Sequence, residues 1–191
     1  MSLSPLHAAA VDLQSLCRAR GWIFCFIGGI AVQRWGLERF TKDADITLMT
    51  DFVNDEAFAR VLLERFEPAR PDAFEFAMRM RVLLLRHPNG TPLDVALGAS
   101  DFETRSIERA SAWMRADGAA LFTCSAEDLI VHKAFAARPQ DWADVDNVLG
   151  VQRAKLDVDL ILRELTPLAE LNPREDVLVR LHGFLKRHGL R

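Results

Sequence analysis

The feature that most constrains the fold is a short apolar run that ends in two glycines and is followed by a second apolar run carrying two aspartates. Residues 22–27 are rich in aromatic and branched side chains and too few for a helix, so they predict a buried strand. Gly28 and Gly29 break the run, and residues 30–35 predict a short helix. Residues 43–49 alternate polar and apolar side chains, which predicts a second strand.

The rest of the pattern extends this α/β (α+β) arrangement. Helices are predicted at residues 3–19, 54–66, 102–115, 125–137, 141–149, 157–168 and 173–188, the last with Pro173 near its start, and strands at residues 74–78, 81–87, 91–97 and 119–124. Asn89-Gly90 is typical of a hairpin turn between two of these strands. We therefore expect a mixed α/β core over residues 1–124 and a helical C-terminal region over residues 125–191, packed on that core.

Composition limits the class of protein. The formal net charge of −3 over 191 residues argues against a surface that coats nucleic acid throughout. Cys17, Cys25 and Cys124 are odd in number and form no C-x-x-C pair, which favours buried thiols over a disulfide framework or a zinc site. No apolar run approaches the ~18 residues of a membrane span. We expect a soluble, cytoplasmic protein without a membrane partner.

Three carboxylates form the sharpest candidate site. On a strand, Asp43 and Asp45 share one face, and Asp94 falls in the middle of an otherwise apolar strand, where a carboxylate is costly unless it is paired or binds a metal. Such acids could hold two Mg²⁺ ions for phosphoryl transfer, with Asp94 beside an attacking hydroxyl whose proton it could accept. The alternative is that all three are structural, with two solvated strand-edge acids and one satisfied buried acid.

Groups that could bind phosphate lie on either side of these acids. If Gly28 and Gly29 open the helix, their backbone N–H groups face an incoming phosphate. Arg39 and Lys42 could neutralise phosphate, or could instead form local salt bridges to the acids. Thr41 either joins this site or bonds only within its own loop.

A second group of charged residues follows at 133–144. Lys133 could face a triphosphate from its helix, or its ammonium group could extend into solvent. Arg138, Asp141 and Asp144 are predicted to pair with one another or to cap the helix break, so they are expected to be structural.

These motifs resemble a known superfamily. The run from Gly28-Gly29 through Gly36 to Arg39-Phe40-Thr41-Lys42-Asp43-Ala44-Asp45 is similar to the signature of the DNA polymerase β-type nucleotidyltransferases, in particular the AbiEii-like nucleotidyltransferase toxin group. Residues 127–144 resemble the second sequence block of that group, so the similarity runs from about residue 27 to residue 149.

The resemblance implies a mixed-sheet core, a helical C-terminal part and transfer of a nucleoside monophosphate from an NTP, with pyrophosphate leaving. It implies a phosphate-binding turn at Gly28 and Gly29, metal ligands at Asp43, Asp45 and Asp94, and a basic residue facing the triphosphate at Lys133. Many members have Gly-Ser at the turn, whereas this chain has Gly-Gly and lacks that hydroxyl.

The acceptor defines the competing hypotheses. We expect transfer to a hydroxyl on RNA (tRNA) or on a partner protein, in a toxin–antitoxin or phage-defence setting that could include a cognate antitoxin. A small-molecule nucleotidyltransferase of the aminoglycoside type keeps the chemistry and changes the acceptor. A catalytically degenerate nucleotide-binding module is the non-enzymatic alternative.

Overall fold

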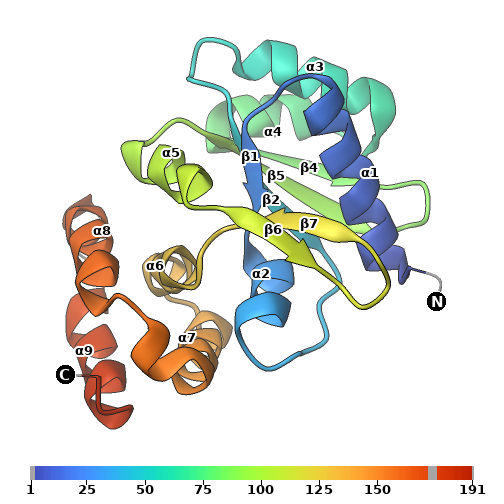
Figure 1. Cartoon of the computed structure of the whole chain (residues 1–191). Helices are drawn as coiled ribbons and strands as arrows, with labels where there is room; N and C mark the ends of the chain where they lie inside the picture. The colour runs from blue at the N-terminus through green and yellow to red at the C-terminus, as the bar shows by residue number, and fades with distance from the viewer. Residues whose placement is uncertain (1–2, 172–175, 191) are drawn as a thin grey trace. The chain divides into compact units, whose positions relative to one another are not determined.

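A computed structural model describes residues 3–171 and 176–190 of the chain (Figure 1). The chain forms two compact units. The first, the sheet unit, contains Met1–Ile30 and Phe40–Cys124, and the second, the helical unit, contains Ala31–Arg39 and Ser125–Arg191. Helix α2 (Gly28–Trp35) begins in the sheet unit and ends in the helical unit.

The described part of the sheet unit is built on one mixed seven-stranded sheet with the order β3-β4-β5-β2-β1-β7-β6. The pairs β1–β7 and β2–β5 are parallel, and the other neighbouring pairs are antiparallel. The strands are β1 (Phe24–Phe26), β2 (Ala44–Met49), β3 (Glu67–Pro68), β4 (Val82–Arg86), β5 (Pro92–Gly98), β6 (Ser111–Met114) and β7 (Ala120–Thr123). Its helices besides α2 are α1 (Pro5–Ala19), α3 (Asp55–Arg65), α4 (Ala73–Met80) and α5 (Asp101–Glu108).

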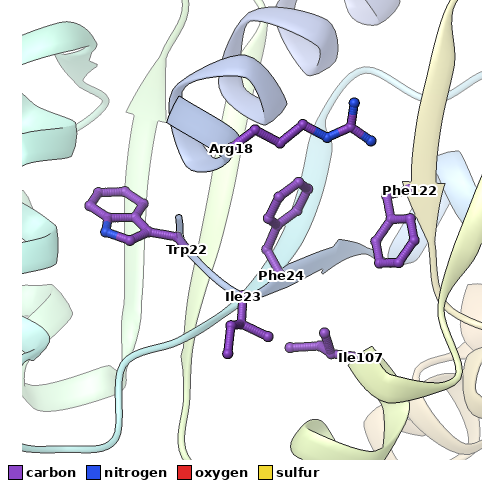
Figure 2. Close-up of a pocket in the computed structure, with 6 residues that line it drawn as sticks. All are labelled: Arg18, Trp22, Ile23, Phe24, Ile107 and Phe122. Atoms are coloured by element: carbon purple, nitrogen blue, oxygen red, sulfur yellow. The ribbon is translucent and has the colours of Figure 1, made fainter. Parts of the chain in front are cut away.

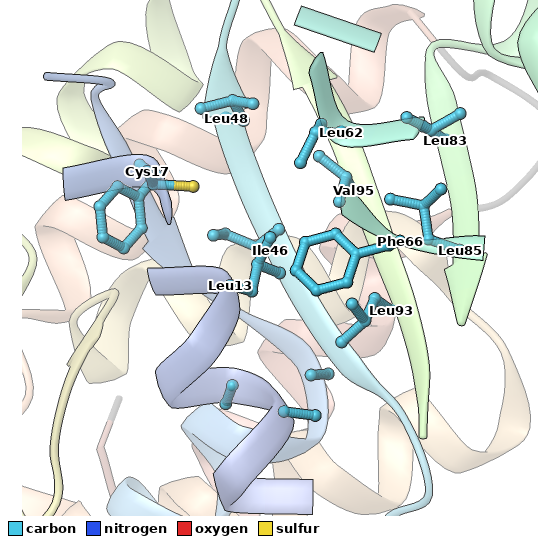
Figure 3. Close-up of a cluster of buried hydrophobic side chains, with 14 of the residues drawn as sticks. Leu13, Cys17, Ile46, Leu48, Leu62, Phe66, Leu83, Leu85, Leu93 and Val95 are labelled. Carbon is cyan, nitrogen blue, oxygen red and sulfur yellow. The ribbon is translucent and has the colours of Figure 1, made fainter. Parts of the chain in front are cut away.

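The hydrophobic core of this unit lies on one face of the sheet, where α1, α3 and α4 pack (Figure 3). Alternation along β2 sends Ala44, Ile46 and Leu48 into this core, all fully buried. Leu93 and Val95 of β5 join them. The side chains at the intervening positions of β2 and β5 therefore point to the opposite face of the sheet.

The helical unit packs its helices around its own apolar residues. It contains α6 (Ala126–Ala136), α7 (Pro139–Gln152), the short 3-10 helix η1 (Arg153–Lys155), α8 (Val158–Leu171) and α9 (Val177–Arg187). Ser125 begins α6 as its N-cap, because its hydroxyl accepts a hydrogen bond from the N–H of Asp128. Within the described residues, no helix is long and apolar enough to span a membrane.

The predicted fold class is confirmed, one predicted strand is wrong, and two predicted helices have other bounds than predicted. Residues 74–78 belong to helix α4 instead of a strand, since Ala73 and Ala77 form a buried stripe at helical spacing. The helix predicted over residues 102–115 ends at Glu108, and β6 follows it at the sheet edge. The helix predicted from residue 141 begins at Pro139, a residue suited to a first turn. Pro173, predicted near the start of the last helix, lies outside the described residues.

Candidate active site

Three carboxylates of the sheet unit meet on the face opposite its core. Asp45 of β2 lies directly across from Asp94 of β5 in the parallel register, and Asp43 immediately precedes β2. Neighbouring strands are ~4.8 Å apart, so paired side chains on one face lie close together. Each residue offers one oxygen such that the three oxygens lie within 4.8 Å of one another. We call Asp43, Asp45 and Asp94 the acid triad.

The environment of Asp94 disfavours the ionised form of its carboxyl group. Burial and the neighbouring charge of Asp43 raise the pKa of Asp94 above its usual range. Within the described residues, no hydrogen bond or ion pair reaches the carboxylate of Asp94, whereas Asp43 accepts a hydrogen bond of 3.0 Å from Oγ1 of Thr41. Clustered carboxylate oxygens are the ligands that hard divalent cations prefer. The residues present therefore fit a Mg²⁺ site.

The glycine turn is fitted closely to this triad. Gly28 has φ +56°, in the left-handed region, and a Cβ there would lie 2.0 Å from Oδ2 of Asp45. A Cβ at Gly29 would lie 2.1 Å from Oγ1 of Thr41. The N–H of Gly29 points to Oδ2 of Asp45 at 3.4 Å. Side chains at either position would displace the groups that define the site, so the turn requires two glycines.

The Gly-Gly turn lacks the serine hydroxyl of a Gly-Ser turn, and the hydroxyl of Thr41 lies in the space that such a serine would occupy. It is buried, and its Oγ1 lies 2.1 Å from the point where a side chain at position 29 would begin. A serine at position 29 would therefore compete with Thr41 for the same space. A hydroxyl is thus present beside the turn, supplied from the loop before β2.

The predicted basic residues have different positions. Lys42 is exposed, and within the described residues no hydrogen bond or salt bridge joins it to Asp43 or Asp45. Arg39 and Lys133 belong to the helical unit, where both bind Asp144. The guanidinium of Arg39 donates to both oxygens of Asp144, from Nε at 2.7 Å and from an Nη atom at 2.8 Å.

Lys133 is the centre of an ion-pair cluster formed by Arg39, Lys133, Arg138, Asp141 and Asp144, in which Lys133 and the two aspartates are buried and Arg138 is exposed. Its Nζ lies 2.9 Å from Asp141 and 2.9 Å from Asp144, and its side chain is 9% exposed. The ammonium group is therefore held inside the unit, and the alternative that it extends into solvent is wrong. The predicted pairing of Arg138 with Asp141 is confirmed, at 2.5 Å.

The pKa values of the two carboxyl groups in the ion-pair cluster are lowered, whereas the pKa of Asp94 is raised. Burial is the largest single influence on Asp141 and opposes its ionisation, but hydrogen bonds from Arg138 and Lys133 outweigh burial and lower its pKa. Burial likewise opposes ionisation of Asp144, and hydrogen bonds from Arg39 and Lys133 lower its pKa. Ionisation of these two carboxylates is therefore favoured, and the negative charge of each lies beside two cationic side chains.

Sequence reasoning missed how the segment before the acids is held. The side chain of Asn147 accepts from the N–H of Leu37 at 2.8 Å and donates to the carbonyl of Leu37 at 3.2 Å. Asp144, one helical turn earlier in α7, holds Arg39. These partners are more than 100 residues apart in sequence, and the only local signal was the i, i+3 spacing of Asp144 and Asn147 on one helix face.

Comparisons with known proteins agree with the fold. No protein-family model matches the sequence, and no curated protein matches it significantly. An antigenic nucleotidyltransferase-like protein from Paracoccidioides brasiliensis superposes with a TM-score of 0.52 at 17% identity, covering 95% of this chain and 92% of that one. The antibiotic-resistance factor ANT(2'')-Ia superposes with a TM-score of 0.51 at 15% identity, covering 93% and 96%. The chain therefore shares the fold of these two solved structures.

Proposed function

We propose that the chain is a metal-dependent nucleotidyltransferase that moves a nucleoside monophosphate from an NTP to an acceptor hydroxyl. The observation that carries the proposal is the acid triad, whose three oxygens lie within 4.8 Å of one another beside a glycine turn that opens a helix. The fold supports the same chemistry.

Each residue has a role in this proposal. Asp43, Asp45 and Asp94 would hold Mg²⁺, as two ions in this proposal, and Gly28 and Gly29 would present backbone N–H groups to the phosphates. When bound, Mg²⁺ would neutralise phosphate oxygens and stabilise the attacking and leaving oxygens. Thr41 orients Asp43 through its hydrogen bond.

The reaction joins the acceptor oxygen to the α-phosphorus of the NTP and breaks the bond from that phosphorus to the departing pyrophosphate. Asp94 is proposed to accept the proton of the attacking hydroxyl. Lys42 is an exposed cation next to Asp43 and is proposed to meet the phosphates. Arg39 and Lys133 are proposed to contribute positive charge to the NTP site, although both already bind Asp144.

For the acceptor, the sequence resemblance to the AbiEii-like toxin group supports RNA, in particular tRNA, or a partner protein in the cytoplasm, with a cognate antitoxin as a further partner. The small-molecule alternative, an aminoglycoside-type acceptor, is favoured by one observation, the superposition on an antibiotic-resistance factor. The degenerate-module alternative predicts NTP binding without transfer.

One assay separates these hypotheses. The protein is incubated with each α-labelled NTP and Mg²⁺, and in turn with total tRNA, candidate partner proteins and aminoglycosides. We expect label in one acceptor class, and a loss on the order of 10³-fold in Asp43→Asn/Asp45→Asn, because removing the metal ligands removes several kcal/mol of transition-state stabilisation.

The control is Asp101→Asn, which removes an exposed carboxylate in the first turn of α5 and should leave transfer unchanged. Label transfer that survives the double substitution would contradict the assignment of the acid triad. NTP binding without transfer to any acceptor would favour the degenerate module.

A further inference from the structure

A second site lies in the sheet unit, away from the acid triad. A cavity of ≈ 200 Å³ opens where the end of α1, the start of β1 and strand β7 come together (Figure 2). Its lining residues are Arg18, Trp22, Ile23, Phe24, Ile107 and Phe122. Five of the six are apolar and three are aromatic, so the cavity is suited to an apolar or aromatic ligand.

The walls of this aromatic pocket are held in place by their neighbours. The ring of Trp22 packs on Phe58 with centroids 4.6 Å apart, and Phe24 meets Phe122 edge-on at 6.3 Å. Phe24 and Ile107 are almost fully buried. Ile23, by contrast, is 63% exposed at the rim, although it directly precedes a buried strand. A preformed apolar wall with an exposed branched side chain is a surface that a ligand can cover.

The single charged group of the pocket is Arg18, in the last turn of α1. Figure 2 shows its side chain extended beside Phe24. Within the described residues, the guanidinium of Arg18 has no hydrogen-bond or ion-pair partner. A guanidinium binds carboxylates through two parallel hydrogen bonds, so its charge is available to an anionic ligand.

We propose that this pocket binds a small aromatic carboxylate, with its ring against Trp22, Phe24 and Phe122 and its carboxylate on Arg18. The size agrees with this ligand class, because an apolar cavity of ~150 Å³ accommodates benzene and this one is larger by about the volume of a short acid group. A neutral ring would leave the guanidinium unused, and a small anion without a ring would leave the apolar walls exposed to water.

The aromatic pocket is separate from the acid triad. The carbonyl of Ile23, at the pocket end of β1, accepts from Met49, whereas the N–H of Ile27, just beyond the other end, donates to the carbonyl of Asp45. Four residues of extended chain span ~13 Å. The pocket is therefore spatially distinct from the proposed NTP site, and its proposal does not rest on the proposed function.

The test follows the Ile23 and Ile107 methyl groups by NMR in the full-length chain while phenylacetate is added. We expect saturable shifts of both signals and none for Ile130 or Ile161 of the helical unit. Phenylacetamide, which has the same shape without the charge, should bind about tenfold more weakly, since a charge-assisted hydrogen bond contributes roughly that factor. Acetate alone should cause no saturable shift.

Three variants complete the test. Arg18→Gln should lose the preference for phenylacetate, while Arg20→Gln, a change at an exposed arginine outside the pocket, should keep it. Ile23→Trp, at an exposed position, should fill the cavity and abolish the shift at Ile107. The proposal is overturned if phenylacetate causes no saturable shift at either methyl group, or if the acid and the amide bind equally. Phenylacetate and phenylacetamide are compared on the unaltered chain, so this part of the test does not depend on whether a variant folds.

Discussion

The acid triad of the sheet unit and the ion-pair cluster of the helical unit both concentrate carboxylates, and they differ in how the charge is met. Asp141 and Asp144 are each bonded to two cationic side chains, and their pKa values are lowered. Asp94 has no such partner among the described residues, and its pKa is raised. Carboxylates neutralised within the protein stabilise the fold, whereas three clustered carboxylates in which ionisation of Asp94 is disfavoured are suited to bind an external cation.

The largest predicted effect breaks the ion-pair cluster. Asp144→Ala leaves Lys133 and Arg39 without a shared partner in a site where Asp144 is 1% exposed. Removing one member of a buried ion pair costs about 3–5 kcal/mol, so urea unfolding should show a loss of that order.

The control is Glu56→Gln, which breaks an exposed pair with Arg60 in α3. Exposed pairs contribute ~0–1 kcal/mol, so this variant should unfold nearly as the unaltered chain does. A small loss in Asp144→Ala, comparable to that of the control, would show that the cluster does not stabilise the fold.

The next effect tests how closely the glycine turn is fitted to the acid triad. Gly28→Ala introduces a side chain at φ +56°, which costs about 1–2 kcal/mol, and its Cβ must also displace Asp45. We expect a loss of unfolding free energy together with a loss of metal affinity. The affinity is measured by titration with Mn²⁺, an oxygen-binding stand-in for Mg²⁺.

Gly21→Ala is the matched control, because Gly21 has φ +67° and a Cβ added there would meet nothing within 4 Å. Gly21→Ala should lower the unfolding free energy by the cost of a side chain in the left-handed region, about 1–2 kcal/mol, and should leave the Mn²⁺ affinity unchanged. Equal metal affinity in the two variants would contradict the close fit between Gly28 and Asp45.

The local pattern predicts much of the fold, because period-two alternation in β2 and β5 fixes which side chains face the core. The segment at residues 74–78 is too short for its period to separate a strand from a helix, and tertiary packing of Ala73 and Ala77 decides it. Strand β6 is mostly exposed at the sheet edge, so it lacks the apolar pattern by which strands are predicted.

In the candidate site, too, local pattern predicts some residues and contacts between distant parts of the sequence decide the others. The residue types and spacing predict that Asp43, Asp45 and Asp94 come together, because Asp45 and Asp94 lie on paired strands and Asp43 immediately precedes β2. The bond from Arg39 to Asp144 joins residues 105 positions apart, and no local rule predicts that partner. The position of Thr41 beside Gly29 likewise depends on how the loop before β2 folds back.

The smallest predicted effects concern pH. The lowered pKa values of Asp141 and Asp144 stabilise the fold above the unfolded aspartate pKa of about 3.9, and this contribution is lost as pH falls through the lowered folded values. Asp94 acts in the opposite sense in metal-free protein. Its raised pKa makes unfolding free energy decrease as pH rises from about 3.9 through the raised value.

The two regions should therefore separate in difference curves of unfolding free energy against pH, measured by urea unfolding in the presence of a chelator. Asp144→Asn should change the pH dependence of unfolding free energy below about pH 4, and Asp94→Asn should change it above about pH 4. If both variants change the curve in the same pH range, the claim that the pKa values of Asp144 and Asp94 are shifted in opposite directions is wrong.

The most direct test of the central claim is a Mn²⁺ titration followed by water-proton relaxation. It compares the unaltered chain with Asp45→Asn and Asp144→Asn at a temperature where circular dichroism shows both variants folded. We predict saturable binding to the unaltered chain and to Asp144→Asn, and at least a tenfold weaker affinity in Asp45→Asn, because Asp45 belongs to the acid triad. Unchanged affinity in Asp45→Asn, or a loss confined to Asp144→Asn, would contradict the claim that the acid triad is the metal site.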